Sequence, residues 1–135
     1  MMKKFTECGY IVKENGPVYF TLDMDKTAKW FEDVLGWYSE IDERNEDGKG
    51  CYGCVYSIPT EIEVTHLAPF TGIHMFYGEP KQEMVCFMHV QGIEKMYEYI
   101  RSKGWEKITE IETQPWGGKT CTLTTIDGSI IHIFE

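Results

Sequence analysis

Two histidines in alternating apolar stretches are the side chains best suited to chemistry in this sequence. His89 lies within residues 85–90, and His132 lies within residues 129–134. Imidazole changes its charge near neutral pH, so one histidine could donate a proton while the other accepts one. Each could instead be a hydrogen-bonded core residue. The two are therefore candidate catalytic residues, and the sequence leaves both roles open.

The five cysteines include one closely spaced pair, Cys51 and Cys54. A structural zinc site needs four ligands, usually from two such pairs, and a thioredoxin-like site places its pair at a helix start. This pair lies in a strand-like stretch, where residues three apart point to opposite faces. We expect ordinary packing and free thiols, and the role of the pair stays open.

The acidic composition narrows the possible partners. A formal net charge of −9 over 135 residues opposes contact with phosphate backbones, so we expect no nucleic-acid partner. No apolar stretch approaches the roughly 20 residues that span a bilayer, and no apolar run follows the N-terminal lysines. We therefore expect a cytoplasmic protein without membrane contact.

An internal repeat supplies the elements that would position these side chains. Gly36-Trp37 recurs as Gly104-Trp105, 68 residues further along the chain. The same shift aligns two alternating apolar stretches. It places Val18, Phe20 and Leu22 on Cys86, Met88 and Val90. Each copy reads as strand, helix, turn and three strands. This pattern predicts an α+β fold of two tandem βαβββ modules, which form a curved mixed sheet around a cleft with the helices on the outer face.

The repeat also predicts where the elements begin and end. We expect one domain, residues 1–135, with modules at about 17–80 and 83–135. The first module has strands at 18–22, 38–42, 51–58 and 73–77 and a helix at 26–35. The second has strands at 85–90, 107–113, 119–125 and 129–134 and a helix at 92–102. Asp23 or Asp25 can cap the first helix, while Gly36 and Gly104 supply left-handed stops.

Strand alternation assigns the side chains that face the cleft. The apolar set Val18, Phe20 and Leu22 is expected to pack against the first helix, which turns the intervening residues inward. The predicted ligand-binding residues are Tyr19, Thr21, His74, Phe76, Phe87, His89, Ile130 and His132, with Trp116 closing one end. Aromatic walls with a few polar tips suit a small organic molecule, although aromatic residues on strands can also be plain core.

Four stretches resemble one known family in their order and spacing. They are residues 22–37, the strand at Val85 with its helix, Pro115-Trp116-Gly117 and residues 126–135. The chain resembles the vicinal oxygen chelate superfamily, which includes glyoxalase I, extradiol dioxygenases and bleomycin-resistance proteins. Its metal-dependent members place ligands on the first and last strand of each module. The matching positions are Pro17, Phe76, Val85 and His132, and only His132 offers a donor atom, so we expect no metal and no cofactor.

The resemblance and the residues together leave three functions open. The leading hypothesis is a metal-independent protein that binds a small, partly aromatic organic molecule, as bleomycin-resistance relatives do. An alternative is a glyoxalase-like lyase or isomerase that uses His89 and His132 or a non-standard metal site. A third is an effector-sensing module that acts with a regulator. The resemblance also implies a homodimer, and neither the identity of the ligand nor the placement of the cleft, within one chain or across two, follows from the sequence.

Overall fold

The computed structural model describes residues 5–10, 16–57 and 72–135. After a short helix α1 (Phe5–Cys8), the first module contains β1 (Val18–Thr21), α2 (Met24–Trp30), η1 (Phe31–Leu35), β2 (Tyr38–Arg44), β3 (Gly50–Tyr56) and β4 (Gly72–Tyr77). The second contains β5 (Met84–His89), α4 (Ile93–Ser102), β6 (Glu112–Thr113), β7 (Lys119–Thr124) and β8 (Ile130–Phe134). The predicted strand 107–113 is thus much shorter, with only an isolated bridge from Ile108 to Leu123 before β6.

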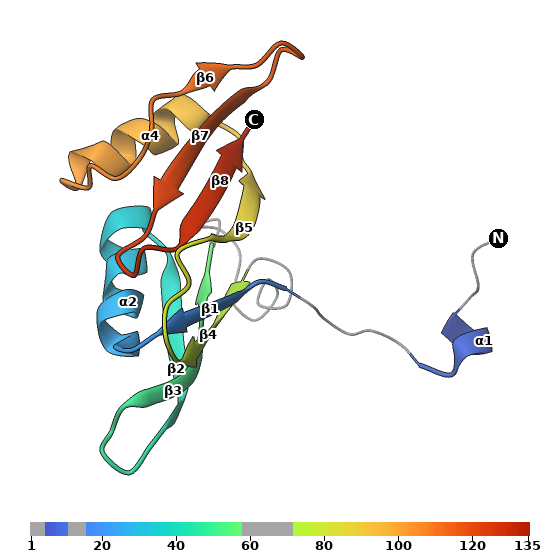
Figure 1. The fold of residues 1–135 in the computed structure, drawn as a ribbon, viewed down its shortest axis with the longest axis vertical. Helices are drawn as coiled ribbons and strands as arrows, with labels where there is room; N and C mark the ends of the chain where they lie inside the picture. The colour runs from blue at the N-terminus through green and yellow to red at the C-terminus, as the bar shows by residue number, and fades with distance from the viewer. Residues whose placement is uncertain (1–4, 11–15, 58–71) are drawn as a thin grey trace.

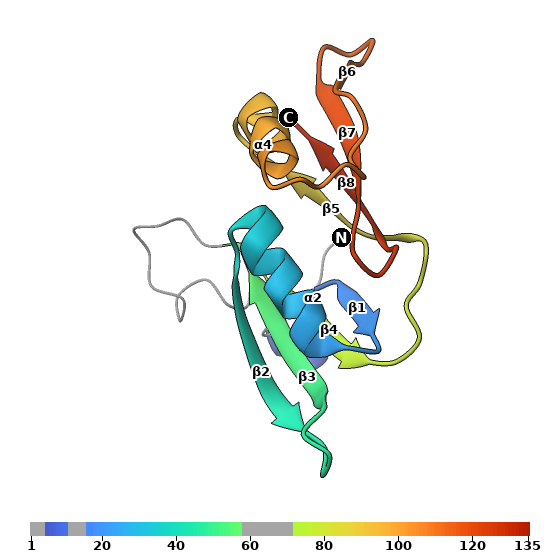
Figure 2. The ribbon, with the colours of Figure 1, turned by 90° about the vertical axis from the view of Figure 1, so that its left-hand side faces the viewer.

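Each module forms a four-stranded mixed sheet. The strand orders are β1-β4-β3-β2 and β5-β8-β7-β6, in which β1 with β4 and β5 with β8 are parallel and the other pairs antiparallel. In Figure 1, α2 and α4 both lie on the left of the strands, and the turned view of Figure 2 places them in front of the sheets. The predicted α+β fold of two tandem βαβββ modules is confirmed.

Capping carboxylates mark the start of both helices, and a glycine ends the first. The Asp23 carboxylate accepts a hydrogen bond from the Lys26 amide and caps α2. The first helical segment stops at Gly36, whose φ of 74° is in the left-handed region that glycine tolerates. Helix α4 is capped from the other end of the chain, because the Glu135 carboxylate accepts from the Gly92 and Ile93 amides. These two amides hold the pKa of Glu135 below its usual range.

A π-helical turn gives the first module one residue more than the second. The helices begin at Met24 and Ile93, which are 69 residues apart, whereas the glycine stops are 68 apart. The extra residue lies in η1, the π-helical segment Phe31–Leu35 that follows α2. Strand β1 therefore matches β5 at a shift of 69, which the ungapped repeat missed by one.

The predicted faces of β1 are wrong for this reason. Tyr19 and Thr21 are fully buried on the helix side, where the Tyr19 ring meets Phe31 edge-on at 5.7 Å between ring centroids. Val18 and Phe20 point to the opposite face instead, and Phe20 lies against Phe76 there. The polar tips of Tyr19 and Thr21 find hydrogen-bond partners inside, which the apolar-polar alternation did not reveal.

Those partners tie the two modules together around Asp127. Its half-buried carboxylate accepts hydrogen bonds from the hydroxyls of Tyr19 at 2.7 Å, Thr27 at 2.6 Å and Thr21 at 3.2 Å. Burial is the main cause that raises the pKa of Tyr19. We call these four residues the Asp127 cluster. It joins β1 and α2 of the first module to the turn between β7 and β8 of the second.

An apolar core continues across the same boundary. Trp30 of α2 packs edge-on against Trp105, with 5.0 Å between ring centroids. Buried residues of both modules form a single cluster. All five cysteines are free thiols. No helix within the described residues is both long and apolar enough to cross a membrane.

Candidate functional site

The face of each sheet opposite its helix, called here its open face, carries aromatic side chains. On the first sheet, Phe76 lies between Phe20 and Tyr52, with 6.3 Å and 5.1 Å between ring centroids. These rings come from three adjacent strands, because Phe20, Phe76 and Tyr52 are paired in register across β1, β4 and β3. The result is a continuous aromatic surface on which a flat ligand could stack.

A hydrogen-bonded group of three side chains adjoins this aromatic surface. The Tyr52 hydroxyl lies 2.7 Å from His74 Nδ1, and Cys54 Sγ lies 3.4 Å from the same nitrogen. Cys54 is buried on the open-face side of β3, whereas Cys51 is half-buried and contacts the Lys49 carbonyl. The two cysteines therefore do not form a joint site, in agreement with the expectation from their spacing.

The open face of the second sheet is built in the same way. His89 stacks on Phe134 with 4.7 Å between ring centroids and 1° between the ring planes. Phe87 and His132 approach the same phenylalanine at 5.9 Å and 6.5 Å. The two candidate catalytic histidines thus share one face and one ring neighbour, and no hydrogen bond joins them within the described residues.

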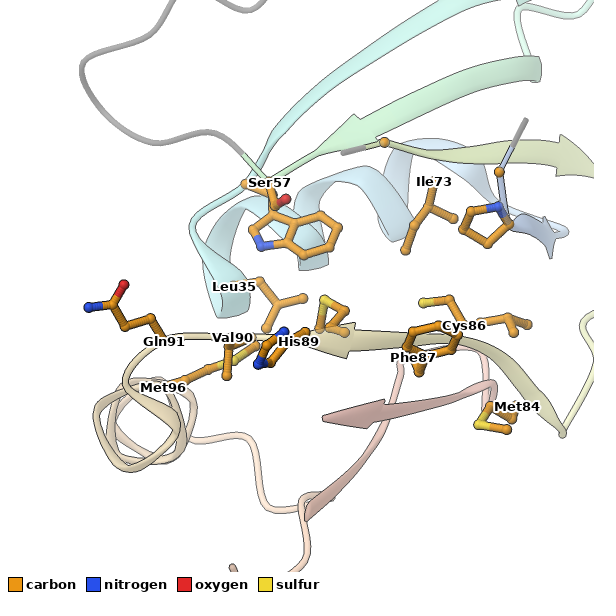
Figure 3. Close-up of a pocket in the computed structure, with 16 residues that line it drawn as sticks. Leu35, Ser57, Ile73, Met84, Cys86, Phe87, His89, Val90, Gln91 and Met96 are labelled. Carbon is orange, nitrogen blue, oxygen red and sulfur yellow. The ribbon is translucent and has the colours of Figure 1, made fainter. Parts of the chain in front are cut away.

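A groove runs between β5 and the first module. Its volume is about 950 Å³. One wall is the unbroken stretch of residues 84–91, and Met96 of α4 adds to it. In Figure 3, β5 crosses the picture, with Leu35, Ser57 and Ile73 along the facing wall. The rest of that wall consists of Gly16, Pro17, Trp37 and Gly72.

The groove is apolar and carries no fixed charge. Its lining holds four sulfur-containing side chains and two large aromatic ones, and none of the described lining residues is an Asp, Glu, Lys or Arg. Phe87 is 69% exposed and Met84 60% exposed, which is unusual for side chains of this size. Burial raises the pKa of the Cys86 thiol to about 11, so this cysteine stays protonated at neutral pH.

The predicted ligand-binding residues separate into four groups. Phe87 and His89 line the groove. Four others lie on the open faces outside the lining, namely His74, Phe76, Ile130 and His132. Tyr19 and Thr21 are turned into the core, as described above. Trp116 lies in the turn before β7, 67% exposed and close over Gly118, and it is not part of the groove.

The corrected register also changes which residues stand at the family's metal positions. Val18 pairs with His74 in the first sheet as Phe87 pairs with His132 in the second, so His74, not Phe76, corresponds to His132. A shift of 69 likewise places Gly16, not Pro17, opposite Val85. Gly16 lies beside His74, since a Cβ built on it would be 3.8 Å from the imidazole. Two of the four positions then carry a donor.

A metal-dependent site needs more donors than these positions supply. Zinc enzymes use three protein ligands, and neither glycine nor valine offers a side-chain donor. Within the described residues, no group of three or more His, Cys, Asp or Glu side chains is close enough to hold an ion. The residues present therefore do not fit the family's metal centre.

Sequence reasoning missed several residues of the open faces. Phe20 was assigned to the wrong face, and Tyr52 and Phe134 were not singled out, although all three contribute rings to the aromatic surfaces. Phe134 could have been found, because strand alternation places it on the same face as His132. Tyr52 could not, because its face relative to His74 depends on the register between β3 and β4. Phe20 needed the extra residue in η1 to be known.

Comparisons with known proteins agree with this architecture. A family model described as the bleomycin resistance protein domain matches residues 16–78. The crystal structure of a glyoxalase-related enzyme from Clostridium phytofermentans is 51% identical, with a TM-score of 0.87 over 94% of this chain and 97% of that chain. No curated protein matches the sequence.

Two more distant structures share the fold. A bleomycin-binding protein complexed with bleomycin is 17% identical, with a TM-score of 0.65 over 92% of this chain and 98% of that chain. A member of the glyoxalase/bleomycin resistance protein/dioxygenase superfamily from Sphaerobacter thermophilus is 16% identical, with a TM-score of 0.70 over 93% and 98%. Because the 51% identical relative aligns over nearly the whole of both chains, this chain belongs to the glyoxalase/bleomycin resistance/dioxygenase superfamily, also called the vicinal oxygen chelate superfamily.

Proposed function

We propose that this protein binds a small, partly aromatic organic molecule in the groove along β5, without a catalytic metal. The observation that carries the proposal is the exposure of Phe87 and Met84 at the rim of an apolar groove of about 950 Å³. Large apolar side chains gathered at an open groove are typical of binding sites, and this volume suits a ligand of drug-like size. We propose that the open-face residues His74, Phe76, Ile130 and His132 extend this surface and that Trp116 closes one end of it.

The chemistry of the lining supports a guest held by ring contacts and hydrogen bonds. Trp37 and Phe87 supply aromatic area, while His89, Gln91 and Ser57 supply the few polar groups that orient a ligand. The two histidines at the family's metal positions are too few for a divalent ion. The net charge of −9 favours a guest with positive charge.

Binding can be tested with two cationic aromatic probes, metal-free bleomycin and the dye thioflavin T. The bleomycin-binding relative makes bleomycin a reasonable first probe. In calorimetric titrations, Phe87→Ala should weaken binding at least about tenfold, because a buried aromatic contact is worth about 1.5–3 kcal/mol. Tyr99→Ala is the matched control, since Tyr99 is an exposed aromatic residue of α4 outside the groove.

Three results would contradict this proposal. The first is binding of either probe that Phe87→Ala leaves unchanged, and the second is no binding of either probe at millimolar concentration. The third is about one tightly held divalent ion per purified chain in elemental analysis.

A second candidate function is a glyoxalase-like lyase or isomerase with His89 and His132 as acid and base. The observation that favours it is the 51% identity to a protein described as a glyoxalase-related enzyme. The test is the turnover of methylglyoxal with glutathione, followed by ultraviolet absorbance. His132→Ala should lower the rate at least a hundredfold if the histidine transfers a proton. An unchanged rate, or no rate in the wild-type protein, would remove this candidate.

We also propose that the chain is one cytoplasmic domain that forms a homodimer. Apolar side chains are exposed on both open faces, such as Phe76 at 36% and Phe87 at 69%. Their exposure supports an interface in which a second copy of the chain covers them. Light scattering of the purified protein tests the dimer, and a monomer mass at every concentration measured would contradict it. An effector-sensing role with a regulator stays a prediction.

A further inference from the structure

Cys54, His74 and Tyr52 place a thiol, an imidazole and a phenol in contact on the open face of the first sheet, the side away from α2 in Figure 1. Cys54 and His74 lie opposite each other in register on β3 and β4, so two paired strands fix their separation. Cys54 Sγ lies 3.4 Å from His74 Nδ1, and the Tyr52 hydroxyl lies 2.7 Å from that nitrogen and 3.5 Å from Sγ. A thiol within hydrogen-bond reach of a base is the arrangement that nucleophilic cysteines use.

The surroundings of the other cysteines differ from those of Cys54. Burial raises the pKa of the Cys86 thiol to about 11 and also raises the pKa of Cys121. Cys51 donates a hydrogen bond to the Lys49 carbonyl. Within the described residues, Cys54 is the only cysteine that an imidazole nitrogen approaches within hydrogen-bond distance. Its neighbours therefore mark this thiol as the one suited to react.

Tyr52 and Cys54 compete for the same acceptor. An imidazole Nδ1 that accepts a hydrogen bond offers one lone pair, and a phenol is a stronger donor than a thiol. The shorter distance to the Tyr52 hydroxyl agrees with this order. Tyr52 in this position therefore keeps the base from the thiol. If the Tyr52 side chain turns aside, the lone pair of Nδ1 becomes available to Cys54.

The rings around Cys54 determine which molecule can reach its sulfur. Cys54 is 4% exposed, because this small side chain lies between Tyr52 and Tyr56, which share its face two residues away on either side. The Tyr52 ring also packs against Phe76, with 5.1 Å between ring centroids. A flat aromatic ligand that stacks on Phe76 competes with Tyr52 for this place. Binding of such a ligand would both uncover the sulfur and release the base.

We propose that Cys54 adds to an α,β-unsaturated carbonyl compound that carries an aromatic ring and displaces Tyr52, with His74 as the base. The bond from Sγ to the β carbon forms as the C=C π bond breaks and its electron pair moves to the α carbon. The thiol proton passes to His74 Nδ1 and from there to the α carbon. No group leaves, and no oxidant or reductant is needed. The proposal goes beyond the binding proposed for the groove along β5 and does not depend on it.

The test uses the full chain and two maleimides with the same reactive group, N-phenylmaleimide and N-ethylmaleimide. Limited labelling at pH 7 followed by peptide mass spectrometry gives the rate at each cysteine. The rate at Cys54 relative to the exposed Cys8 should be at least about tenfold higher with the phenyl compound than with the ethyl compound. Phe76→Ala should reduce this preference. Tyr77→Ala is the matched control, because Tyr77 is an exposed aromatic residue on the other face of β4.

Two further variants should change the rate at Cys54 in opposite directions. Tyr52→Phe keeps the ring and removes the competing hydroxyl, so N-phenylmaleimide should label Cys54 about threefold or more faster. His74→Gln removes the base and should slow the labelling about tenfold or more. A general loosening of the sheet would raise the rate in both variants, and thermal unfolding of each variant measures its stability.

Three outcomes would overturn the proposal. They are no labelling of Cys54, an equal ratio of Cys54 to Cys8 labelling with the two maleimides, and a rate at Cys54 that His74→Gln leaves unchanged or raises. Binding of thioflavin T without labelling of Cys54 would refute this proposal and leave the small-molecule proposal standing. Selective labelling of Cys54 without binding of thioflavin T or bleomycin would have the reverse meaning.

Discussion

Removal of the Asp127 carboxylate should weaken the junction of the two modules more than any other single polar change. In the Asp127 cluster three hydroxyls donate to this one carboxylate. A hydrogen bond to a charged group contributes about 1.5–3 kcal/mol, but the hydroxyls can partly pair with one another after the change. Tyr19 retains Thr125 at 2.6 Å, and Thr21 and Thr27, whose hydroxyl oxygens are 2.8 Å apart, can bond each other once Asp127 no longer takes their protons. We therefore expect Asp127→Ala to lower the free energy of unfolding by about 3–5 kcal/mol.

Urea and thermal unfolding measure this loss directly. For a chain of this size the expected change corresponds to a Tm lower by about 10–18 °C. Asp47→Ala is the matched control, because Asp47 is an exposed carboxylate in the turn between β2 and β3. A double-mutant cycle with Tyr19→Phe should give a coupling energy of about 1–2 kcal/mol. A loss below about 1 kcal/mol for Asp127→Ala, or zero coupling to Tyr19, would refute the reasoning.

Three further predictions concern single residues. Burial raises the pKa of the Cys86 thiol to about 11, so iodoacetamide at pH 8 should alkylate the exposed Cys8 at least about tenfold faster than Cys86. Peptide mass spectrometry measures both rates, and equal rates would contradict this. The lowered pKa of Glu135 stabilises the fold above the ordinary value of 4.5, and this effect is lost as the pH falls through the lowered pKa. Glu135→Gln should therefore lower Tm more at pH 7 than in acid, and an equal change in Tm at every pH would contradict this. Gly53→Ala would place a Cβ 2.5 Å from the Glu40 carbonyl oxygen, and we expect a loss of about 2 kcal/mol or more in urea unfolding, with wild-type stability as the contrary result.

The order of helices and strands could be predicted because the helix caps, glycine stops and apolar alternation agreed with the 68-residue repeat. Asp23 caps the first helix and Gly36 ends it, as their residue types indicate. The alternation in β5 and β8 correctly placed Phe87 and His132 on the open face. The predicted strand 107–113 was mostly wrong, because only its last two residues pair along β7 as a strand.

The faces of β1 could not be predicted from local alternation. The sequence offered apolar residues at 18, 20 and 22 and polar ones between, which normally indicates that the apolar set is buried. Here Thr21 is buried because Asp127, more than 100 residues away, supplies an acceptor. Nor does an ungapped repeat show a π-helical insertion in Phe31–Leu35. Both facts depend on contacts that form only in the folded chain.

The continuous core between the halves bears on whether either half can exist by itself. A fragment ending near Gly78 would keep its sheet and helix, but it would expose the Trp30 face that Trp105 covers and leave the hydroxyls of Tyr19 and Thr27 without their acceptor. In the complementary fragment, the Asp127 carboxylate would lack the three hydroxyl groups that donate hydrogen bonds to it. Two such pieces, made as separate polypeptides, should be poorly structured alone and recover the native fold on mixing, so this protein could serve as a split reporter whose signal depends on reassembly.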